Sequence, residues 1–212
     1  MDKAVRLNAN ASLYNERPDL FMAAAIGISD VLKLQGHTPV LTTSGPETAE
    51  AISGFEARSY NPGRQQLDLR SHLELLAAST DLAGPKTDFL VTDWDMFAEG
   101  TWYVFGVTIY EWQLSVQSVA RFVRHTSDVK LQGKLMTHIA RHEYAHMAGM
   151  ISPQDYSHPD RRSGLYAGHC ANVCTLQQVM MVPETLSLAS KLDGHELAGF
   201  CAGCVTSLRR KA

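Results

Sequence analysis

The stretch Arg141-His-Glu-Tyr-Ala-His-Met-Ala-Gly149 decides how the rest of the sequence is interpreted. It contains an HExxHxxG pattern made by His142, Glu143, His146 and Gly149. Residues four apart lie on the same face of a helix, so the two imidazoles can bind one metal ion while Glu143 projects beside them. Two histidines at this spacing with a glutamate between them are typical of zinc sites that activate a water molecule for hydrolysis.

A hydrolytic zinc site needs a third protein ligand besides these two histidines, with the fourth position left open for water. In one extended form of the pattern, HExxHxxGxxH, a third histidine follows the second after six residues, because the chain turns back at the glycine. Here that position is Ser152. The candidates are therefore His158 and His169, which follow a segment with Pro153, Pro159 and Gly164 that can loop out. We favour His169, because it directly precedes Cys170.

The four cysteines of the chain all lie in this C-terminal part, as a CxxxC pair and a CxxC pair. They are Cys170, Cys174, Cys201 and Cys204, with 26 residues between the pairs. Four thiolates at such spacings are typical of a tetrahedral structural zinc site, and in a reducing compartment this interpretation is favoured over disulfides. A metal bound to Cys170 would hold the neighbouring His169 in a fixed place.

Length and composition indicate an ordinary globular protein. The 212 residues show no repeat or linker, and we expect a single domain over 1–212, with an N-terminal subdomain at 1–150 and a zinc-stabilised C-terminal subdomain at 151–212. The formal charge of -3 and the absence of a basic stripe argue against nucleic-acid and membrane partners. Neither a signal peptide nor a membrane span is recognisable, so we expect a cytoplasmic protein.

The hydrophobic pattern predicts the α/β fold class, with a mixed sheet flanked by helices and an irregular C-terminal part. Strands are expected at 38–43, 88–92, 102–110 and 112–119, and the last two are expected to form a hairpin or a neighbouring pair. Helices are expected at 18–34, 64–78 and 129–150, with short helical patches at 172–181 and 183–192. The helix at about 129–150 carries the histidine motif.

Taken together, these features resemble the archaemetzincins, a family of metzincin-class zinc peptidases. The family pattern HExxHxxGxxHCxxxxCxM, followed by CxxC, is similar to His142 to Gly149, His169-Cys170, Cys174, Met180 and Phe200-Cys-Ala-Gly-Cys204. Upstream, the segments similar to the family are Asn61-Pro-Gly-Arg-Gln65 as a helix start, Phe89-Leu-Val-Thr-Asp-Trp-Asp-Met-Phe97, Val104-Phe-Gly106 and Ser118-Val-Ala-Arg121. The resemblance covers the chain from about residue 61 to its end.

The resemblance implies a metzincin-like fold and a zinc-dependent metallopeptidase that hydrolyses peptide bonds of peptide or protein substrates. It implies one catalytic zinc ion bound by His142, His146 and His169, with Glu143 as the general base. It also implies one structural zinc ion bound by Cys170, Cys174, Cys201 and Cys204. Met180 would form a methionine turn under the catalytic metal, or it serves plain core packing. The alternative function is a non-catalytic zinc-binding protein of the same fold that holds a partner, and a glutamate at position 143 favours the enzyme.

The sequence departs from the family pattern in two places. His169 follows His146 by 23 residues instead of six, which corresponds to an insertion of about 17 residues. We expect the segment 151–168 to form an excursion at the mouth of the cleft, tolerated because both of its ends are fixed. Met180 follows Cys174 by six residues where the family has two, so we expect a local rearrangement of the methionine turn.

Overall fold

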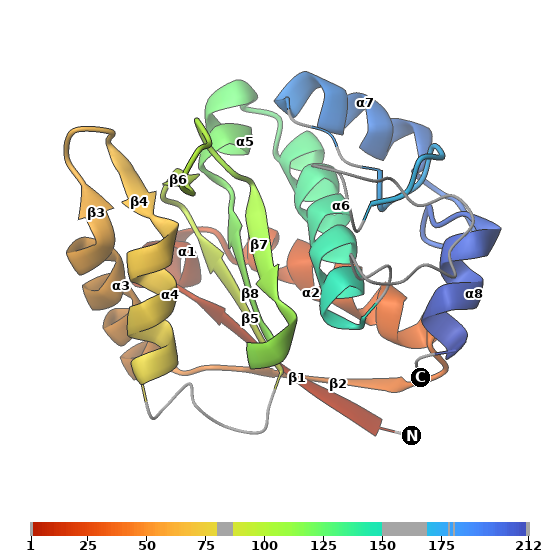
Figure 1. Ribbon diagram of the computed structural model, residues 1–212, viewed down its shortest axis with the longest axis horizontal. Coiled ribbons are helices and arrows are strands. Elements are labelled where there is room, and N and C mark those ends of the chain that lie inside the picture. Colours follow the sequence, from red (N-terminus) through yellow and green to blue (C-terminus); the bar gives the residue numbers. More distant parts are fainter. Residues whose placement is uncertain (1, 80–86, 150–168, 178, 180, 211–212) are drawn as a thin grey trace.

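The structure is a computed structural model that describes residues 2–79, 87–149, 169–177, 179 and 181–210. The expectations for the segment 151–168, for His158 and for Met180 lie outside the described residues. Figure 1 shows a central sheet with helices on both sides and the C-terminal helix Val182–Lys191 next to the motif helix. The α/β architecture with a mixed sheet and flanking helices is therefore confirmed.

The central sheet has five strands in the order β2-β1-β5-β8-β7. Strands β1 (Asp2–Ala9), β2 (Thr38–Thr43), β5 (Thr87–Thr92) and β8 (Leu114–Ser118) run parallel to one another. Strand β7 (Gly106–Ile109) pairs antiparallel with β8 and places Thr108 opposite Ser115. The predicted strand at 38–43 and the predicted hairpin are confirmed, with the 3-10 turn Tyr110–Trp112 joining β7 to β8.

Both faces of the sheet are covered, as the alternation along β5 shows. Phe89 and Val91 point into a core shared with α2 (Pro18–Leu34) and α6 (Val129–Met147). Leu90 points into a second core, which it shares with helices α3 (Pro46–Ser59) and α4 (Leu69–Ala78). A parallel strand that is buried on both faces reads as a continuous apolar run, and this explains why β5 was recognisable in the sequence.

A small second sheet occupies residues where the second helix was expected to begin. Strands β3 (Tyr60–Asn61) and β4 (Gln66–Asp68) pair antiparallel, and β4 pairs parallel with β6 (Met96–Phe97). The helix predicted from residue 64 therefore begins only at Leu69, where the Asp68 side chain accepts hydrogen bonds from the first backbone N–H groups of α4. The predicted helix start at 61–65 was wrong, since Asn61 ends β3 and residues 62–65 form the turn between β3 and β4.

Other elements were not predicted or differ from their prediction. The sequence did not indicate β1, α3, α1 (Ala11–Glu16), α5 (Ala120–His125) or α8 (Ala202–Arg210). The helical patch at 183–192 corresponds to α7 (Val182–Lys191). The patch at 172–181 was wrong, because its described residues form bends and turns around Cys174. The basic residues Arg209 and Arg210 lie exposed in the last turn of α8.

Helix α6 is amphipathic and borders the sheet. Its apolar face carries Leu135, Met136 and Ile139 into the core, while Lys130 and Lys134 are exposed. Asp128 caps its start by accepting hydrogen bonds from the backbone N–H groups of Lys130 and Leu131. Within the described part of the chain, no helix combines the length and the apolar character needed to cross a membrane.

Candidate metal centre

Helix α6 is held in place by a close approach to α2. At Gly27 an added Cβ would lie 2.5 Å from the Thr137 carbonyl oxygen and 2.8 Å from the Ala140 Cβ, so the two helices meet at a position where only glycine fits. Arg141 donates two hydrogen bonds to an Asp30 carboxylate oxygen on α2, from Nε at 2.9 Å and from a terminal nitrogen at 2.7 Å. These contacts fix the rotation of α6 about its axis directly before the motif.

The helix ends directly after the motif. The N–H of Gly149 bonds the His146 carbonyl at 2.9 Å, and Gly149 has a φ of 77°. Glycine adopts this left-handed conformation without the steric cost that a Cβ brings. The predicted helix exit at Gly149 is confirmed, and both motif histidines lie in the last two turns of α6.

The structure brings His142, His146 and His169 together. One ligand atom of each residue lies within 4.8 Å of the others, and the ring centroids are 4.8 to 5.2 Å apart. The Nε2 atoms of His142 and His146 are 3.2 Å apart. A tetrahedral zinc ion with Zn–N bonds of about 2.0–2.1 Å separates two ligand nitrogens by about 3.4 Å, so this spacing fits one shared ion.

A backbone carbonyl orients His142. Its Nδ1 lies 2.8 Å from the carbonyl oxygen of Thr175, which can only accept, so Nδ1 carries the hydrogen and Nε2 presents its lone pair to the other imidazoles. Burial lowers the pKa of His142 to about 4, although the bond to Thr175 acts in the opposite direction. The neutral imidazole, which is the form that binds metals, is therefore favoured.

Glu143 lies beside the triad and contacts the edge of the sheet. Thr108 on β7 donates a hydrogen bond from its hydroxyl to Glu143 Oε2 at 2.8 Å. Burial raises the pKa of Glu143 to about 7, while the bond from Thr108 lowers it. A carboxyl group whose pKa is close to neutral can both accept and return a proton.

The four cysteines form the second cluster. Their sulfur atoms lie within 4.8 Å of one another, and the distances from Cys170 to Cys201 and from Cys174 to Cys204 are 3.8 and 3.6 Å. All four are free thiols, since a disulfide has sulfurs about 2.05 Å apart. Zinc with Zn–S bonds of about 2.3 Å separates tetrahedral sulfurs by about 3.8 Å, which matches this cluster.

The cysteine cluster also positions the histidine cluster, by two routes. His169 directly precedes Cys170, as the sequence indicated, and Thr175, whose carbonyl orients His142, directly follows Cys174. Thr175 is fixed by bonds from its N–H to the Gly199 carbonyl and from its hydroxyl to the Ala198 carbonyl, both 2.9 Å long. A metal that holds the four sulfurs would therefore stabilise one candidate ligand and the orientation of another.

Sequence reasoning found the clustered residues but missed their supports. Thr108 and Thr175 carry no pattern of their own, although the position of Thr175 next to Cys174 was a usable signal. His138, one turn before His142, is buried, and burial lowers its pKa to about 3. It belongs to neither ligand cluster found among the described residues.

Comparison with known proteins defines the fold of the chain. No protein-family profile and no curated protein matches the sequence. Among solved structures, the archaemetzincin of Methanopyrus kandleri matches with a TM-score of 0.67 and 20% identity over 99% of this chain and 95% of that chain. A zinc-dependent peptidase of Methanocorpusculum labreanum matches with a TM-score of 0.61 and 16% identity, covering 96% of this chain and 99% of that chain. The archaemetzincin of Archaeoglobus fulgidus, complexed with malonate, matches with a TM-score of 0.60, 18% identity and the same coverage.

These matches show that the chain has the archaemetzincin fold over nearly its whole length. The resemblance suggested by the histidine and cysteine motifs is thus confirmed at the level of the fold. Because one fold can carry different activities, the function has to be argued from the site itself.

Proposed function

We propose that this protein is a zinc-dependent metallopeptidase. The observation that carries the proposal is the convergence of three imidazoles, from His142, His146 and His169, beside the carboxylate of Glu143. The three similar solved structures are archaemetzincins or a zinc-dependent peptidase by name, which supports the same activity. Three histidines with a fourth position for water are the donor set of a catalytic zinc site.

Two metal ions per chain follow from the two donor sets. The histidine cluster suits one zinc ion, and the thiolates of Cys170, Cys174, Cys201 and Cys204 suit a second. The four sulfurs leave no open position, so this second ion is structural. It would connect the start of α8, which carries Cys204, to the loop that holds His169 and Thr175.

The reaction needs a proton acceptor next to the attacking water, and Glu143 is placed for this role. Zinc, when bound, lowers the pKa of water to about 7 and polarises the carbonyl group of the substrate. Glu143 accepts the proton as the water attacks the scissile carbonyl and then gives it to the leaving amine. Thr108, through its hydrogen bond to Glu143 Oε2, holds the carboxylate in one orientation.

The edge of the sheet suits a peptide substrate. Strand β7 is one of the two edge strands of the five-stranded sheet in the described part of the chain, and it carries Thr108 next to Glu143. An extended peptide can pair with such an edge through main-chain hydrogen bonds. A peptide bound along β7 would pass the histidine cluster with its backbone presented to Glu143.

The alternative function, a zinc protein that only binds a partner, is less well supported by these contacts. A binding protein has no need for a partly buried carboxylate between its ligands, and no need for the threonine hydroxyl that orients it. Both groups are present, as Glu143 and Thr108. They favour catalysis over binding alone.

The proposal is tested by Glu143→Ala, with Glu196→Ala as a matched control. Glu196 is exposed and follows His195, so it repeats the start of the motif without a second histidine four residues later. We expect Glu143→Ala to retain its zinc and to lose hydrolysis of a peptide library, while Glu196→Ala retains both. Equal turnover by the parent and Glu143→Ala would refute the mechanism, and absence of turnover in the zinc-loaded parent would favour the binding protein.

A further inference from the structure

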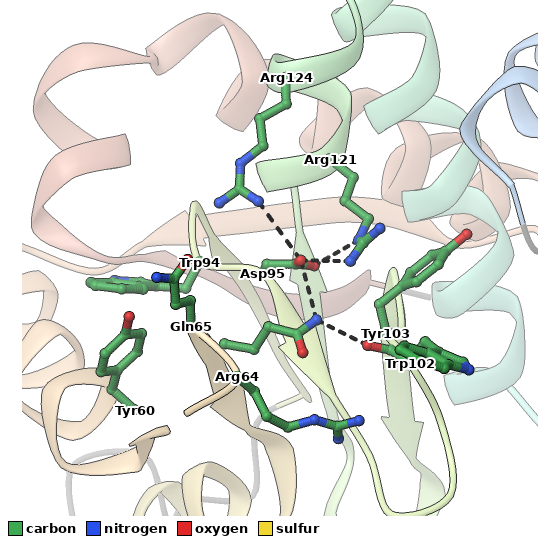
Figure 2. Close-up of a pocket in the computed structure, with 10 residues that line it drawn as sticks. Tyr60, Arg64, Gln65, Trp94, Asp95, Trp102, Tyr103, Arg121 and Arg124 are labelled. Carbon is green, nitrogen blue, oxygen red and sulfur yellow. Dashed lines mark hydrogen bonds and ion pairs between the residues drawn. The ribbon is translucent and has the colours of Figure 1, made fainter. Parts of the chain in front are cut away.

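A pocket of about 630 Å³ lies away from both ligand clusters. It opens between the turn that joins β3 to β4, the loop that follows β5 and the start of α5 (Figure 2). None of its lining residues belongs to the histidine or cysteine cluster. The pocket therefore needs an explanation of its own.

Aromatic side chains form two opposite walls of this pocket. Tyr60 and Trp94 contact each other on one side with ring centroids 5.0 Å apart, and Trp102 and Tyr103 lie on the other side (Figure 2). Trp102 is 87% exposed, which is unusual for the largest apolar side chain. Exposed aromatic rings around a hollow are typical of a binding site.

Arginines give the pocket a positive charge. Arg64, Arg121 and Arg124 line it together with one carboxylate, that of Asp95, and the other lining residues are neutral. The lining therefore has a surplus of two positive charges. Figure 2 shows Arg121 and Arg124 both directed toward Asp95, with Arg64 on the opposite rim.

The three arginines are not equivalent. Arg121 has a structural role, because it donates to both oxygens of the buried Asp95 at 2.9 and 2.7 Å and its guanidinium carbon lies 3.6 Å from the Tyr103 ring centroid. Arg124 lies 3.8 Å from Asp95 and its side chain is 67% exposed, so this ion pair contributes little to stability. Arg64 stacks on Phe97 and donates one bond, to the Thr101 carbonyl. Arg64 and Arg124 thus retain N–H donors for a ligand, and a guanidinium group suits a carboxylate.

The chain connects this pocket to the candidate metal centre. Tyr103 lies five residues before Thr108, and the segment between them enters strand β7. The N–H of Val104 bonds the Met96 carbonyl, and the Phe105 carbonyl accepts from the N–H of Ser118, so strand-like pairing continues before Gly106, with a bend at Phe105. At about 3.3 Å per residue, five residues span at most about 16 Å. A peptide lying along β7 would therefore reach the pocket four to six residues from the bond beside Glu143.

We propose that this pocket is a substrate subsite that binds a carboxylate of the peptide, four to six residues from the scissile bond. This inference rests on the proposed peptidase function and adds a preference for acidic substrates. The carboxylate is that of a Glu or Asp side chain or that of the C-terminus of the peptide, and the aromatic walls pack against the chain that carries it. Arg124 and Arg64 bind the carboxylate, while Arg121 positions the floor of the pocket through Asp95.

The preference is measured with peptide pairs that differ at one position. Each pair carries Glu or Gln at a position four to six residues from the cleaved bond, and each peptide is made with a free and with an amidated C-terminus. Since a charge-assisted hydrogen bond outweighs a neutral one, we expect KM to be about tenfold lower for one Glu peptide than for its Gln partner, or for the free C-terminus than for the amide. A difference between Glu and Gln identifies a side-chain carboxylate, and a difference between the free and the amidated C-terminus identifies the terminal carboxylate.

Variants connect the preference to the arginines. In the double variant Arg64→Gln and Arg124→Gln, the ratio of kcat/KM between the two peptides of the responding pair, Glu against Gln or free against amidated C-terminus, should fall close to one. Arg70→Gln removes the same charge from an exposed position on α4 outside the pocket and should keep the ratio of the parent. A double variant that keeps this ratio would overturn the assignment, and an equal loss in Arg70→Gln would reduce it to a general charge effect.

Binding to Glu143→Ala tests the subsite without turnover. Trp94 and Trp102 report occupancy of the pocket by their fluorescence, and the peptide that carries the recognised carboxylate should bind about tenfold more tightly than its Gln or amidated partner. Equal affinities within every pair, with equal rates in the parent, would refute the subsite while leaving the peptidase intact. A carboxylate preference in binding with no hydrolysis by the zinc-loaded parent would instead refute the peptidase and leave the carboxylate site.

Discussion

Thr108 provides a way to separate the positioning of Glu143 from the binding of zinc. Its hydroxyl lies 2.8 Å from Glu143 Oε2, 3.1 Å from the Glu143 carbonyl oxygen and 3.0 Å from the Ser115 hydroxyl. Thr108→Val preserves the shape of the side chain and removes the hydroxyl. Thr108→Ser keeps the hydroxyl and removes the methyl group, so it is the matched control.

The expected loss follows from the chemistry of this contact. A hydrogen bond to a charged group contributes about 1.5–3 kcal/mol, which corresponds to a factor of about 10 to 150. The affected group is the proposed general base and not a substrate-binding group, so the loss should appear in kcat with little change in KM. Zinc content should be unchanged, because Thr108 is not in either ligand cluster.

The assay is steady-state hydrolysis of one peptide by the parent and both variants, each with its zinc content measured by elemental analysis. We expect Thr108→Val to lose at least about tenfold in kcat, and Thr108→Ser to remain close to the parent. If Thr108→Val hydrolyses the peptide as fast as the parent does, the hydrogen bond has no role in orienting the base. If it loses zinc, the residue supports the metal and not Glu143.

Three further predictions concern stability. Burial raises the pKa of Glu56 to about 7 from 4.5 and the residue is 1% exposed, so the contribution of Glu56 to the free energy of unfolding should fall by about 3 kcal/mol between pH 4.5 and 7. Glu56→Gln should remove this slope in urea titrations, and an unchanged slope would contradict the burial argument. Burial lowers the pKa of His72 from 6.5 to about 4, so the contribution of His72 to stability is lost as the pH falls from 6.5 to 4. His72→Leu should reduce this loss, and a variant with the pH dependence of the parent would exclude His72 as its cause. Replacing Cys201 and Cys204 by serine should lower the thermal midpoint and release one zinc ion, and a double variant as stable as the parent would exclude a structural zinc site.

The motif helix was predictable because its signals are local. Leu135 and Ile139 repeat at helical spacing with the histidines, Asp128 provides the cap and Gly149 provides the stop. The expected range 129–150 therefore agrees closely with Val129–Met147. The hairpin of β7 and β8 was likewise indicated by two short runs of aromatic and β-branched residues.

Strand β1 and helix α3 were missed because their signals depend on tertiary contacts. Strand β1 carries Arg6 in its middle, and this charge is compatible with a central strand only because Arg6 pairs with Asp88 on the neighbouring β5. Helix α3 buries Glu56 and Ser59 as well as Ile52, so it shows no apolar stripe in the sequence. Neither the pairing of Arg6 with Asp88 nor the burial of Glu56 can be inferred before the strand order is known.

The residues of the candidate metal centre also divide into those with a local sequence signal and those that depend on tertiary contacts. The histidines and cysteines were found from their spacing, since ligand chemistry restricts the residue types that can bind zinc. The contacts of Thr108 with Glu143 and of Thr175 with His142 join residues 35 and 33 positions apart and use a hydroxyl and a backbone carbonyl. Such groups occur throughout any chain, so only the folded structure identifies them.

The most direct test of two separate metal sites is the zinc content per chain of the purified protein, the His169→Ala variant and the His158→Ala variant, with all cysteines reduced. We predict two zinc ions in the parent and in His158→Ala, and one in His169→Ala, because only the histidine cluster loses a ligand. A parent with a single zinc ion would contradict the account, and so would a catalytic zinc that survives in His169→Ala and is lost in His158→Ala.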